Sequence, residues 1–136
     1  MLEIFTGRMS CHGVKGYRGP DALNITRGSG GGLGLYFAPS RDLLNEGLRL
    51  KRAAKKDAGK LAEAWSWYET KFIEEMRAQW KDPLFRGALN SLLGRKTVTL
   101  LCYCGGRQKR CHRFLVAESV LVKLGATYMG ERPKET

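Results

Sequence analysis

The residues with the greatest capacity for chemistry gather in one stretch of the chain, from Thr97 to Phe114. This stretch holds Cys102, Cys104, Arg107, Lys109, Arg110, Cys111, His112 and Arg113. Thiolates are nucleophiles and ligands for zinc, and histidine binds metals or transfers protons. Arginine donates paired hydrogen bonds to phosphate oxygens. These residue types predict thiol, metal or phosphate chemistry here.

A strand, a loop and a helix must position these residues. The run from Thr97 to Tyr103 is β-branched, apolar and aromatic, which predicts a buried strand over 97–103. Gly105 and Gly106 end it. After the basic loop, an apolar face spaced as in a helix predicts a helix that opens at 111–113, with Phe114, Leu115, Ala117, Val120, Leu121 and Leu124 inward. The unpaired amides of a helix start favour anions and thiolates.

One interpretation of the cluster is a zinc site. Cys102, Cys104 and Cys111 would supply three ligands, and His112 or the pair Cys11-His12 the fourth. The spacing C-x-C-x6-C-H is not one of the usual zinc spacings. Zinc is therefore a candidate cofactor that the spacing alone does not establish.

A second interpretation is a thiolate that attacks or holds an oxyanion. Cys104 and Arg110 form C-x5-R between a strand and a helix, the spacing of phosphatases and sulfurtransferases. Helix amides and an arginine would stabilise the thiolate and a tetrahedral anion. The motif is short, and a loop this basic meets it easily by chance.

In a third interpretation the cysteines are partly structural and the site is a pocket for a nucleotide or sugar phosphate. Phosphate would be held by Arg113, Arg110, Arg107 and Arg8. His112 would act as general acid or base, and Cys102 or Cys111 would line the site. The plainer alternative is that His112 and Arg113 only cap the helix and pair there.

The charge distribution supports an anionic partner. The 136 residues carry a formal net charge of +11, and residues 95–113 hold six Lys or Arg and no acid. Such a field attracts phosphate, nucleotides or nucleic acid. The alternative is that the basic residues only keep the protein soluble.

The chain before this stretch predicts further strands and loops. Residues 2–6 form a first buried strand, and the loop 8–19 holds Arg8, Cys11 and His12. If strands 2–6 and 98–103 are parallel neighbours, Cys11 and His12 could face the other cysteines. A strand at 22–26 precedes the glycine-rich loop 28–34, which lacks both the dinucleotide fingerprint and a P-loop and is either a lid or a surface loop.

Three helices are predicted between the strands. A helix over 41–56 begins at Ser40 and ends in a basic cluster, a second spans 59–80 with an apolar stripe, and a third spans 84–93. Trp67 and Ile73 lie off the stripe, which suggests contact with a second surface such as another copy of the chain, and hence a homo-oligomer. A last short strand at 126–129 precedes a charged tail, 131–136, expected to be frayed.

Length and composition predict one soluble domain over residues 1–136. There is no signal peptide and no apolar run long enough to span a bilayer, so we expect a cytoplasmic protein without a membrane partner. Four clustered cysteines indicate a metal site or reactive thiols, not a secreted disulfide scaffold.

The segment LLCYCGGRQKRCHRFLVAESV resembles the signature of an uncharacterised group of small α/β proteins, domain-of-unknown-function family 488. In that family a strand ends in Leu-Leu-Cys, here at Cys102, and a Cys-His-Arg triplet, here 111–113, starts the next helix. The likeness extends upstream through PDALNIT and FAPSRDLL. It implies a Rossmann-like three-layer fold with its site at Cys102, Cys111, His112 and Arg113. It names no activity, and Cys104 is not a fixed feature of the pattern.

Together these observations predict a single α/β domain with a small, mostly parallel sheet and helices on both faces. Strand 97–103 would be central, flanked by 2–6 and by 22–26 or 126–129. The leading functional hypothesis is an enzyme acting on a nucleotide or on a nucleic-acid base or sugar phosphate. The alternatives are a non-catalytic nucleic-acid-binding protein, a zinc-stabilised module and a thiolate phosphatase or sulfurtransferase.

Overall fold

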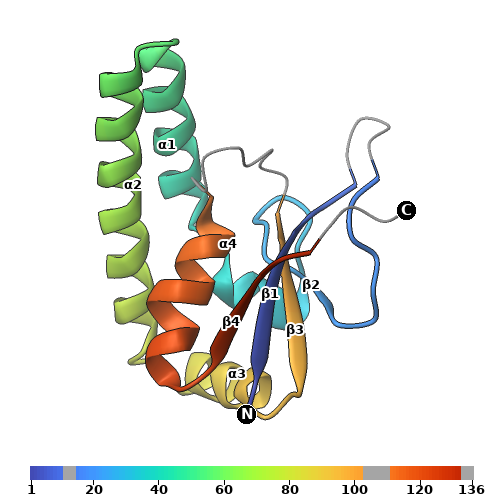
Figure 1. Ribbon diagram of the computed structural model, residues 1–136. Helices are drawn as coiled ribbons and strands as arrows, with labels where there is room; N and C mark the ends of the chain where they lie inside the picture. The colour runs from blue at the N-terminus through green and yellow to red at the C-terminus, as the bar shows by residue number, and fades with distance from the viewer. Residues whose placement is uncertain (11–14, 103–110, 133–136) are drawn as a thin grey trace.

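The computed structural model describes residues 1–10, 15–102 and 111–132, which contain one parallel sheet. Its strands are β1 (Glu3–Arg8), β2 (Ala22–Asn24), β3 (Thr97–Cys102) and β4 (Thr127–Glu131), in the order β2-β3-β1-β4 (Figure 1). All three pairings are parallel. The predicted single α/β domain with a small parallel sheet is confirmed. Strand β3 is flanked by β1 and β2, and β4 lies on the far side of β1.

Helices fill the two long connections between strands. Between β2 and β3 the chain forms the 3₁₀ helix η1 (Gly32–Phe37), α1 (Arg41–Ala54), α2 (Ala58–Gln79) and α3 (Pro83–Leu93). The predicted cap Ser40 accepts a hydrogen bond from the Leu43 amide. Asp57 and Asp82 cap α2 and α3 in the same way. Helix α1 ends at Ala54, slightly before the predicted end at residue 56, because Lys55 has φ of 53° and cannot continue the helix.

The connection from β3 to β4 is one helical segment that changes its winding. It consists of α4 (His112–Leu115), the π-helical η2 (Val116–Leu121) and the 3₁₀ turn η3 (Val122–Leu124). The wider and then tighter turns shift the helical phase after Leu115. Leu124, predicted to face inward, is therefore 41 % exposed.

The hydrophobic core lies between the sheet and the helices. Ile4, Val98 and Leu100 from the strands pack in one cluster with Phe72 of α2 and Leu121 of η2. The cluster also takes in Trp67 and Ile73, which are partly buried. Both residues therefore pack against the chain's own core, and the homo-oligomer that the sequence suggested stays a prediction.

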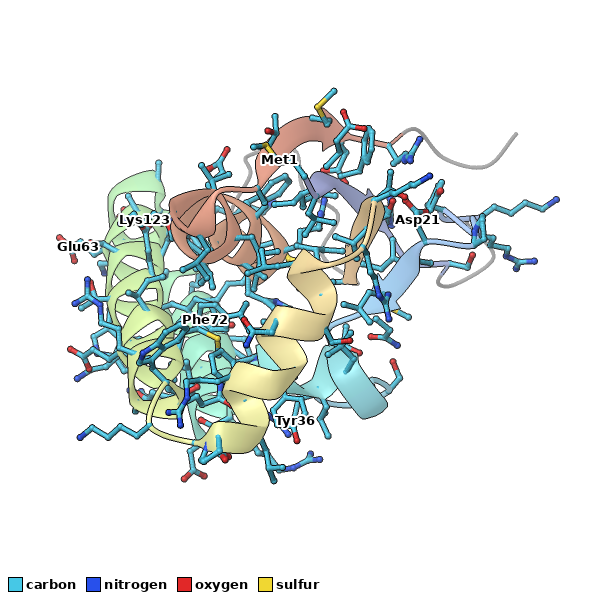
Figure 2. The ribbon with its side chains drawn as sticks, turned by 90° about the horizontal axis from the view of Figure 1, so that it is seen from below. Met1, Asp21, Tyr36, Glu63, Phe72 and Lys123 are labelled. Atoms are coloured by element: carbon cyan, nitrogen blue, oxygen red, sulfur yellow. A yellow bond between two sulfur atoms is a disulfide. The ribbon has the colours of Figure 1, made fainter. Side chains whose placement is uncertain are left out.

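The described helices all cover one face of the sheet, which corrects the prediction of helices on both faces (Figure 1 and Figure 2). Both helical connections step across the sheet in the same direction, from β2 to β3 and from β3 over β1 to β4. Right-handed crossovers in one direction place their helices on one face. The connection from β1 to β2 steps the opposite way, and its residues 15–21 cover the other face without a helix.

Asp21 is the centre of the contacts on that other face. Its carboxylate accepts hydrogen bonds from Tyr17 Oη at 2.6 Å, Thr99 Oγ1 at 3.0 Å and Arg132 Nη2 at 3.3 Å. The Arg132 guanidinium also stacks 3.6 Å from the centre of the Phe5 ring. Residues 131 and 132, predicted to begin a frayed tail, are thus bound to the sheet, and 133–136 lie outside the described residues.

We expect Asp21→Asn to lower the free energy of unfolding by about 1–2 kcal/mol at pH 7, since charge-assisted hydrogen bonds would be lost. Burial acts to raise the pKa of Asp21, but the hydrogen bonds from Tyr17 and Thr99 and the charge of Arg132 together lower it. A lowered carboxyl pKa stabilises the fold above the unfolded pKa of about 4, and that contribution is lost as pH falls through the folded pKa. The difference between wild type and variant should therefore shrink below pH 4.

Urea unfolding, followed by tryptophan fluorescence at pH 7 and below pH 4, measures the difference in stability between wild type and Asp21→Asn. Glu63→Gln is the control, because Glu63 is exposed on α2 and points away from the sheet (Figure 2). Equal stability of Asp21→Asn and wild type at pH 7 would contradict the prediction.

The glycine-rich segment packs closely against β2. A Cβ at Gly34 would lie 1.9 Å from the Asn24 carbonyl oxygen, so only glycine fits at this position. The segment is thus held against the sheet at Gly34, and a lid function of its earlier part stays a prediction. No helix in the described part of the chain is both long enough and apolar enough to cross a membrane.

Candidate functional site

The candidate site lies where the parallel strands end. Cys102 is the last residue of β3, and Arg8, the last residue of β1, lies directly beside it in the register. Cys111, His112 and Arg113 come from the start of α4 and meet Cys102 from the helical side of the sheet. Ligands of open α/β sheets bind at this carboxyl edge. The structure thus brings together four of the residues that the sequence singled out and places a fifth beside them.

The two sulfur atoms of the site are in direct contact. Cys102 and Cys111 are joined as a disulfide, and both are almost fully buried. The sequence predicted thiols or metal ligands and no disulfide between these two residues. Their proximity follows from the tertiary fold, because a strand end and a helix start nine residues apart meet at one point.

His112 is buried and has one ring nitrogen engaged. Its Nε2 lies 2.6 Å from the carbonyl oxygen of Ile25, just after β2. A carbonyl only accepts hydrogen bonds, so Nε2 carries the hydrogen and Nδ1 presents its lone pair. Nδ1 lies 3.8 Å from Cys111 Sγ. Burial, with a smaller contribution from the charge of Arg113, lowers the His112 pKa to about 4, although the bond to Ile25 opposes the shift. The ring is therefore neutral at pH 7.

Arg113 is directed into the protein. Its Nη1 donates to Cys102 Sγ at 2.9 Å, and its Nε and Nη2 donate to the Glu131 carboxylate at 3.2 Å. The guanidinium also lies 4.5 Å from the centre of the Phe114 ring. Only 2 % of the residue is exposed. These contacts orient Arg113 toward the sulfur, although the sequence assigned it to phosphate.

Arg8 is the other described arginine of the predicted anion site. It is half-buried, and its Nε has no hydrogen-bond partner within the described residues. Ile4, Thr6 and Arg8 alternate along β1, so Arg8 shares a face with Cys102 on the neighbouring strand. A buried N–H without a partner is costly, which suits a position that a ligand completes.

Several predicted site residues fall outside the described part of the chain. These are Cys11, His12, Cys104, Arg107 and Arg110. Their proposed roles in zinc binding, in the C-x5-R motif and in phosphate binding therefore stay predictions.

Sequence reasoning missed three partners of the site. Glu131 was assigned to a frayed tail, although the alternation from Thr127 could have extended the strand to it. Phe72 was recognised as apolar, and its ring lies 5.8 Å from that of His112. The Ile25 carbonyl has no signature in a sequence, because any residue carries one.

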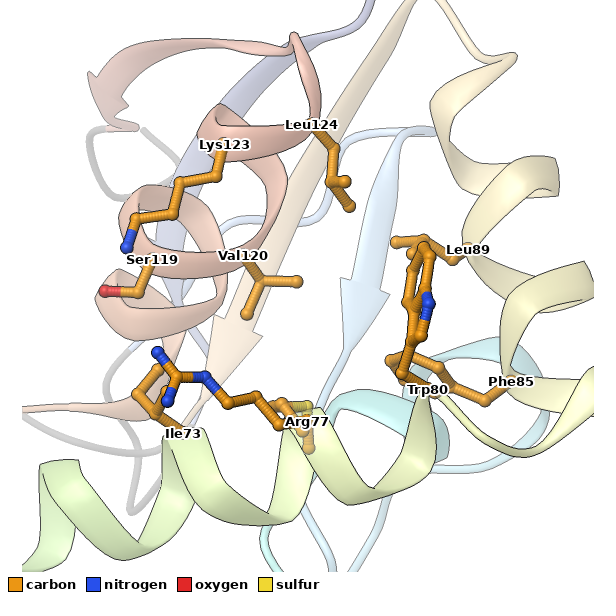
Figure 3. Close-up of a pocket in the computed structure, with 10 residues that line it drawn as sticks. Ile73, Arg77, Trp80, Phe85, Leu89, Ser119, Val120, Lys123 and Leu124 are labelled. Atoms are coloured by element: carbon orange, nitrogen blue, oxygen red, sulfur yellow. The ribbon is translucent and has the colours of Figure 1, made fainter.

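A groove of about 410 Å³ lies elsewhere, between α2, α3 and the end of the η2–η3 segment (Figure 3). Met76 and Leu124 contribute apolar surface, Trp80 lines one side, and Arg77 and Lys123 line the other. None of the predicted site residues lines it. The groove is thus a separate surface feature.

The chain matches a family model described as the active DUF488-N3 subclade over residues 36–124, more than half of its length. The matched span contains β3, Cys102 and the triplet 111–113, and leaves out Arg8 and Glu131. No curated protein and no solved structure matches the chain.

Proposed function

The chain belongs to the DUF488 family, and from this premise we propose that it is an enzyme acting on a nucleotide or on a nucleic-acid base or sugar phosphate. The substrate would lie at the carboxyl edge of the sheet, with its phosphate at Arg8 and its reacting part against the Cys102 sulfur. The observation that carries this proposal is the hydrogen bond from Arg113 Nη1 to Cys102 Sγ in a buried site.

The Arg113 contact supports a thiolate at Cys102 in the reduced protein. A permanently charged guanidinium that donates to sulfur stabilises the anion over the thiol. The contact is 2.9 Å long, and both side chains are buried, so water screens it little. A thiolate is the form in which cysteine reacts or binds a metal.

Arg8 supports a substrate that carries phosphate. Its side chain lies on the same face as Cys102, and its buried Nε lacks a partner within the described residues. A phosphate oxygen would supply the acceptor and neutralise the charge. The net charge of +11 favours an anionic substrate in the same way.

Arg113 acts through Cys102 in this proposal and is therefore a positioning residue, and the neutral ring of His112 carries no positive charge for a phosphate. His112 donates from Nε2 to Ile25, and Arg113 is bound to Glu131. These contacts occupy His112 Nε2–H and guanidinium N–H groups of Arg113, which would otherwise donate to a phosphate. This assigns the phosphate to Arg8 in place of Arg113.

Replacement of Arg8 tests the proposal. We expect Arg8→Met to weaken binding of nucleoside monophosphates to the reduced protein by at least tenfold, because a charge-assisted contact is worth about 1.4 kcal/mol or more. Calorimetric titration with a panel of ribo- and deoxyribonucleoside monophosphates measures it.

Arg95→Met is the matched control, since Arg95 is exposed before the amino end of β3, at the opposite edge of the sheet. If Arg8→Met binds nucleoside monophosphates as tightly as wild type, or if Arg95→Met loses as much affinity, Arg8 is not the phosphate ligand. Absence of binding by wild type to every nucleotide of the panel would remove the substrate class.

A non-catalytic nucleic-acid-binding function has one observation in its favour. Lys51, Arg52, Lys55 and Lys56 are all exposed at the end of α1. If they bind a nucleic-acid backbone, Lys55→Ala with Lys56→Ala should weaken oligonucleotide binding and flatten its salt dependence. The same double variant should leave mononucleotide binding at Arg8 unchanged.

A further inference from the structure

Two cysteine sulfurs and an imidazole of the site lie close enough together to hold one metal ion once the disulfide is reduced. Cys102 Sγ, Cys111 Sγ and a ring nitrogen of His112 lie within 4.8 Å of one another, and all three residues are buried. We propose that the reduced protein binds Zn²⁺ through Cys102, Cys111 and His112. Only the role of the metal in catalysis rests on the proposed function. Zinc binding itself is measured without substrate.

The orientation of His112 supports this assignment. Its Nε2–H donates to the Ile25 carbonyl, which holds the ring and leaves Nδ1 as the free lone pair, 3.8 Å from Cys111 Sγ. Histidines that bind metals almost always donate their other ring N–H to a carbonyl, a carboxylate or water. Phe72 supports the ring, with the ring centres 5.8 Å apart.

The spacing of the cysteines also suits a bridging ion. The Cα atoms of Cys102 and Cys111 are 7.7 Å apart, beyond the range of about 4.4–6.8 Å usual for a disulfide. In a zinc dithiolate each sulfur lies about 2.3 Å from the ion, so the two sulfur atoms are farther apart than in a disulfide. A zinc ion therefore bridges cysteines whose Cα atoms are more widely separated. The disulfide and the zinc site use the same sulfur atoms, so each excludes the other.

The surrounding charges suit a zinc dithiolate. Two thiolates neutralise Zn²⁺, and Arg113 with Glu131 adds a cation and an anion. The Arg113 N–H to Cys102 Sγ is the kind of outer hydrogen bond that tunes a metal-bound sulfur.

Sulfur and imidazole ligands favour zinc over hard cations such as Mg²⁺. The described residues supply three ligands, and catalytic zinc sites have three protein ligands with a fourth position for water or substrate. Such an ion would place a Lewis acid beside the phosphate proposed at Arg8.

Cobalt substitution tests the inference. The full chain is reduced without oxygen, stripped with a chelator and titrated with Co²⁺, followed by Zn²⁺ as competitor. We expect one Co²⁺ per chain, with thiolate-to-cobalt charge transfer and the intense visible bands of a tetrahedral site, and displacement by Zn²⁺. Cys102→Ser, Cys111→Ser and His112→Asn should each weaken Zn²⁺ binding at least tenfold, and Glu63→Gln should not.

Protection of thiols by zinc keeps the inference testable if a variant fails to fold. With Zn²⁺ bound to the wild-type protein, peptide mass spectrometry should find Cys102 and Cys111 protected from alkylation, and a chelator should expose them. Absence of the charge-transfer band, or alkylation of both residues at equal rates with and without Zn²⁺, would overturn the inference.

The outcomes also separate this inference from the proposed function. If the protein binds zinc but no nucleotide, the metal site is supported and the proposal of a nucleotide enzyme is rejected. Nucleotide binding that depends on Arg8, in a protein that binds neither Co²⁺ nor Zn²⁺, would do the reverse.

Discussion

Arg113→Met is expected to lower the free energy of unfolding of the reduced, metal-free protein by about 2–4 kcal/mol. The substitution keeps an unbranched side chain of similar length but removes the hydrogen bonds to Glu131 and Cys102. Breaking a buried ion pair costs about 3–5 kcal/mol. The Glu131 side chain is 38 % exposed and can regain water, so we expect a somewhat smaller loss.

Urea unfolding followed by tryptophan fluorescence measures the loss. Arg113→Lys should recover part of the stability, because lysine keeps the charge but not the planar fork. The ultraviolet absorbance of thiolate at pH 7 should also fall in Arg113→Met and stay near the wild-type level in Arg95→Met. Full stability together with unchanged thiolate absorbance would show that the contact between Arg113 and Cys102 is unimportant.

Phe72→Ala should lower the free energy of unfolding by about 3–5 kcal/mol, the usual cost of removing a buried phenylalanine. Phe72 is fully buried in the core cluster, points inward from α2 (Figure 2), and lies between the rings of Tyr68 and His112. Its removal leaves a cavity against the His112 ring. We therefore expect weaker Zn²⁺ binding as well, because the ring loses the packing that orients it.

Phe72→Leu is the control that keeps most of the apolar volume, and it should cost less than half as much. The two variants are compared by the same unfolding measurement and by competition for Zn²⁺. A loss below about 1 kcal/mol in Phe72→Ala would mean that α2 does not depend on this contact.

The sequence by itself determined the local elements and marked the residues of the candidate site. Helices α1 and α3 follow from Ser40, Asp82-Pro83 and a 3.6-residue apolar period, and β3 follows from its β-branched run. Each signal acts within a few residues, so it survives without knowledge of the rest of the chain. The triplet 111–113 after a buried strand likewise marked the site, and the family match covers it.

The tertiary structure decided what those residues touch. The contacts of His112 with Ile25 and of Arg113 with Glu131 join segments 87 and 18 residues apart. They depend on the strand order β2-β3-β1-β4, which also placed the described helices on one face. Strand order is set by long-range packing and crossover handedness, for which no local pattern exists. The same packing directed Arg113, which the sequence assigned to phosphate, toward the sulfur of Cys102. It also buried the Nε–H of Arg8, for which the described residues offer no hydrogen-bond acceptor.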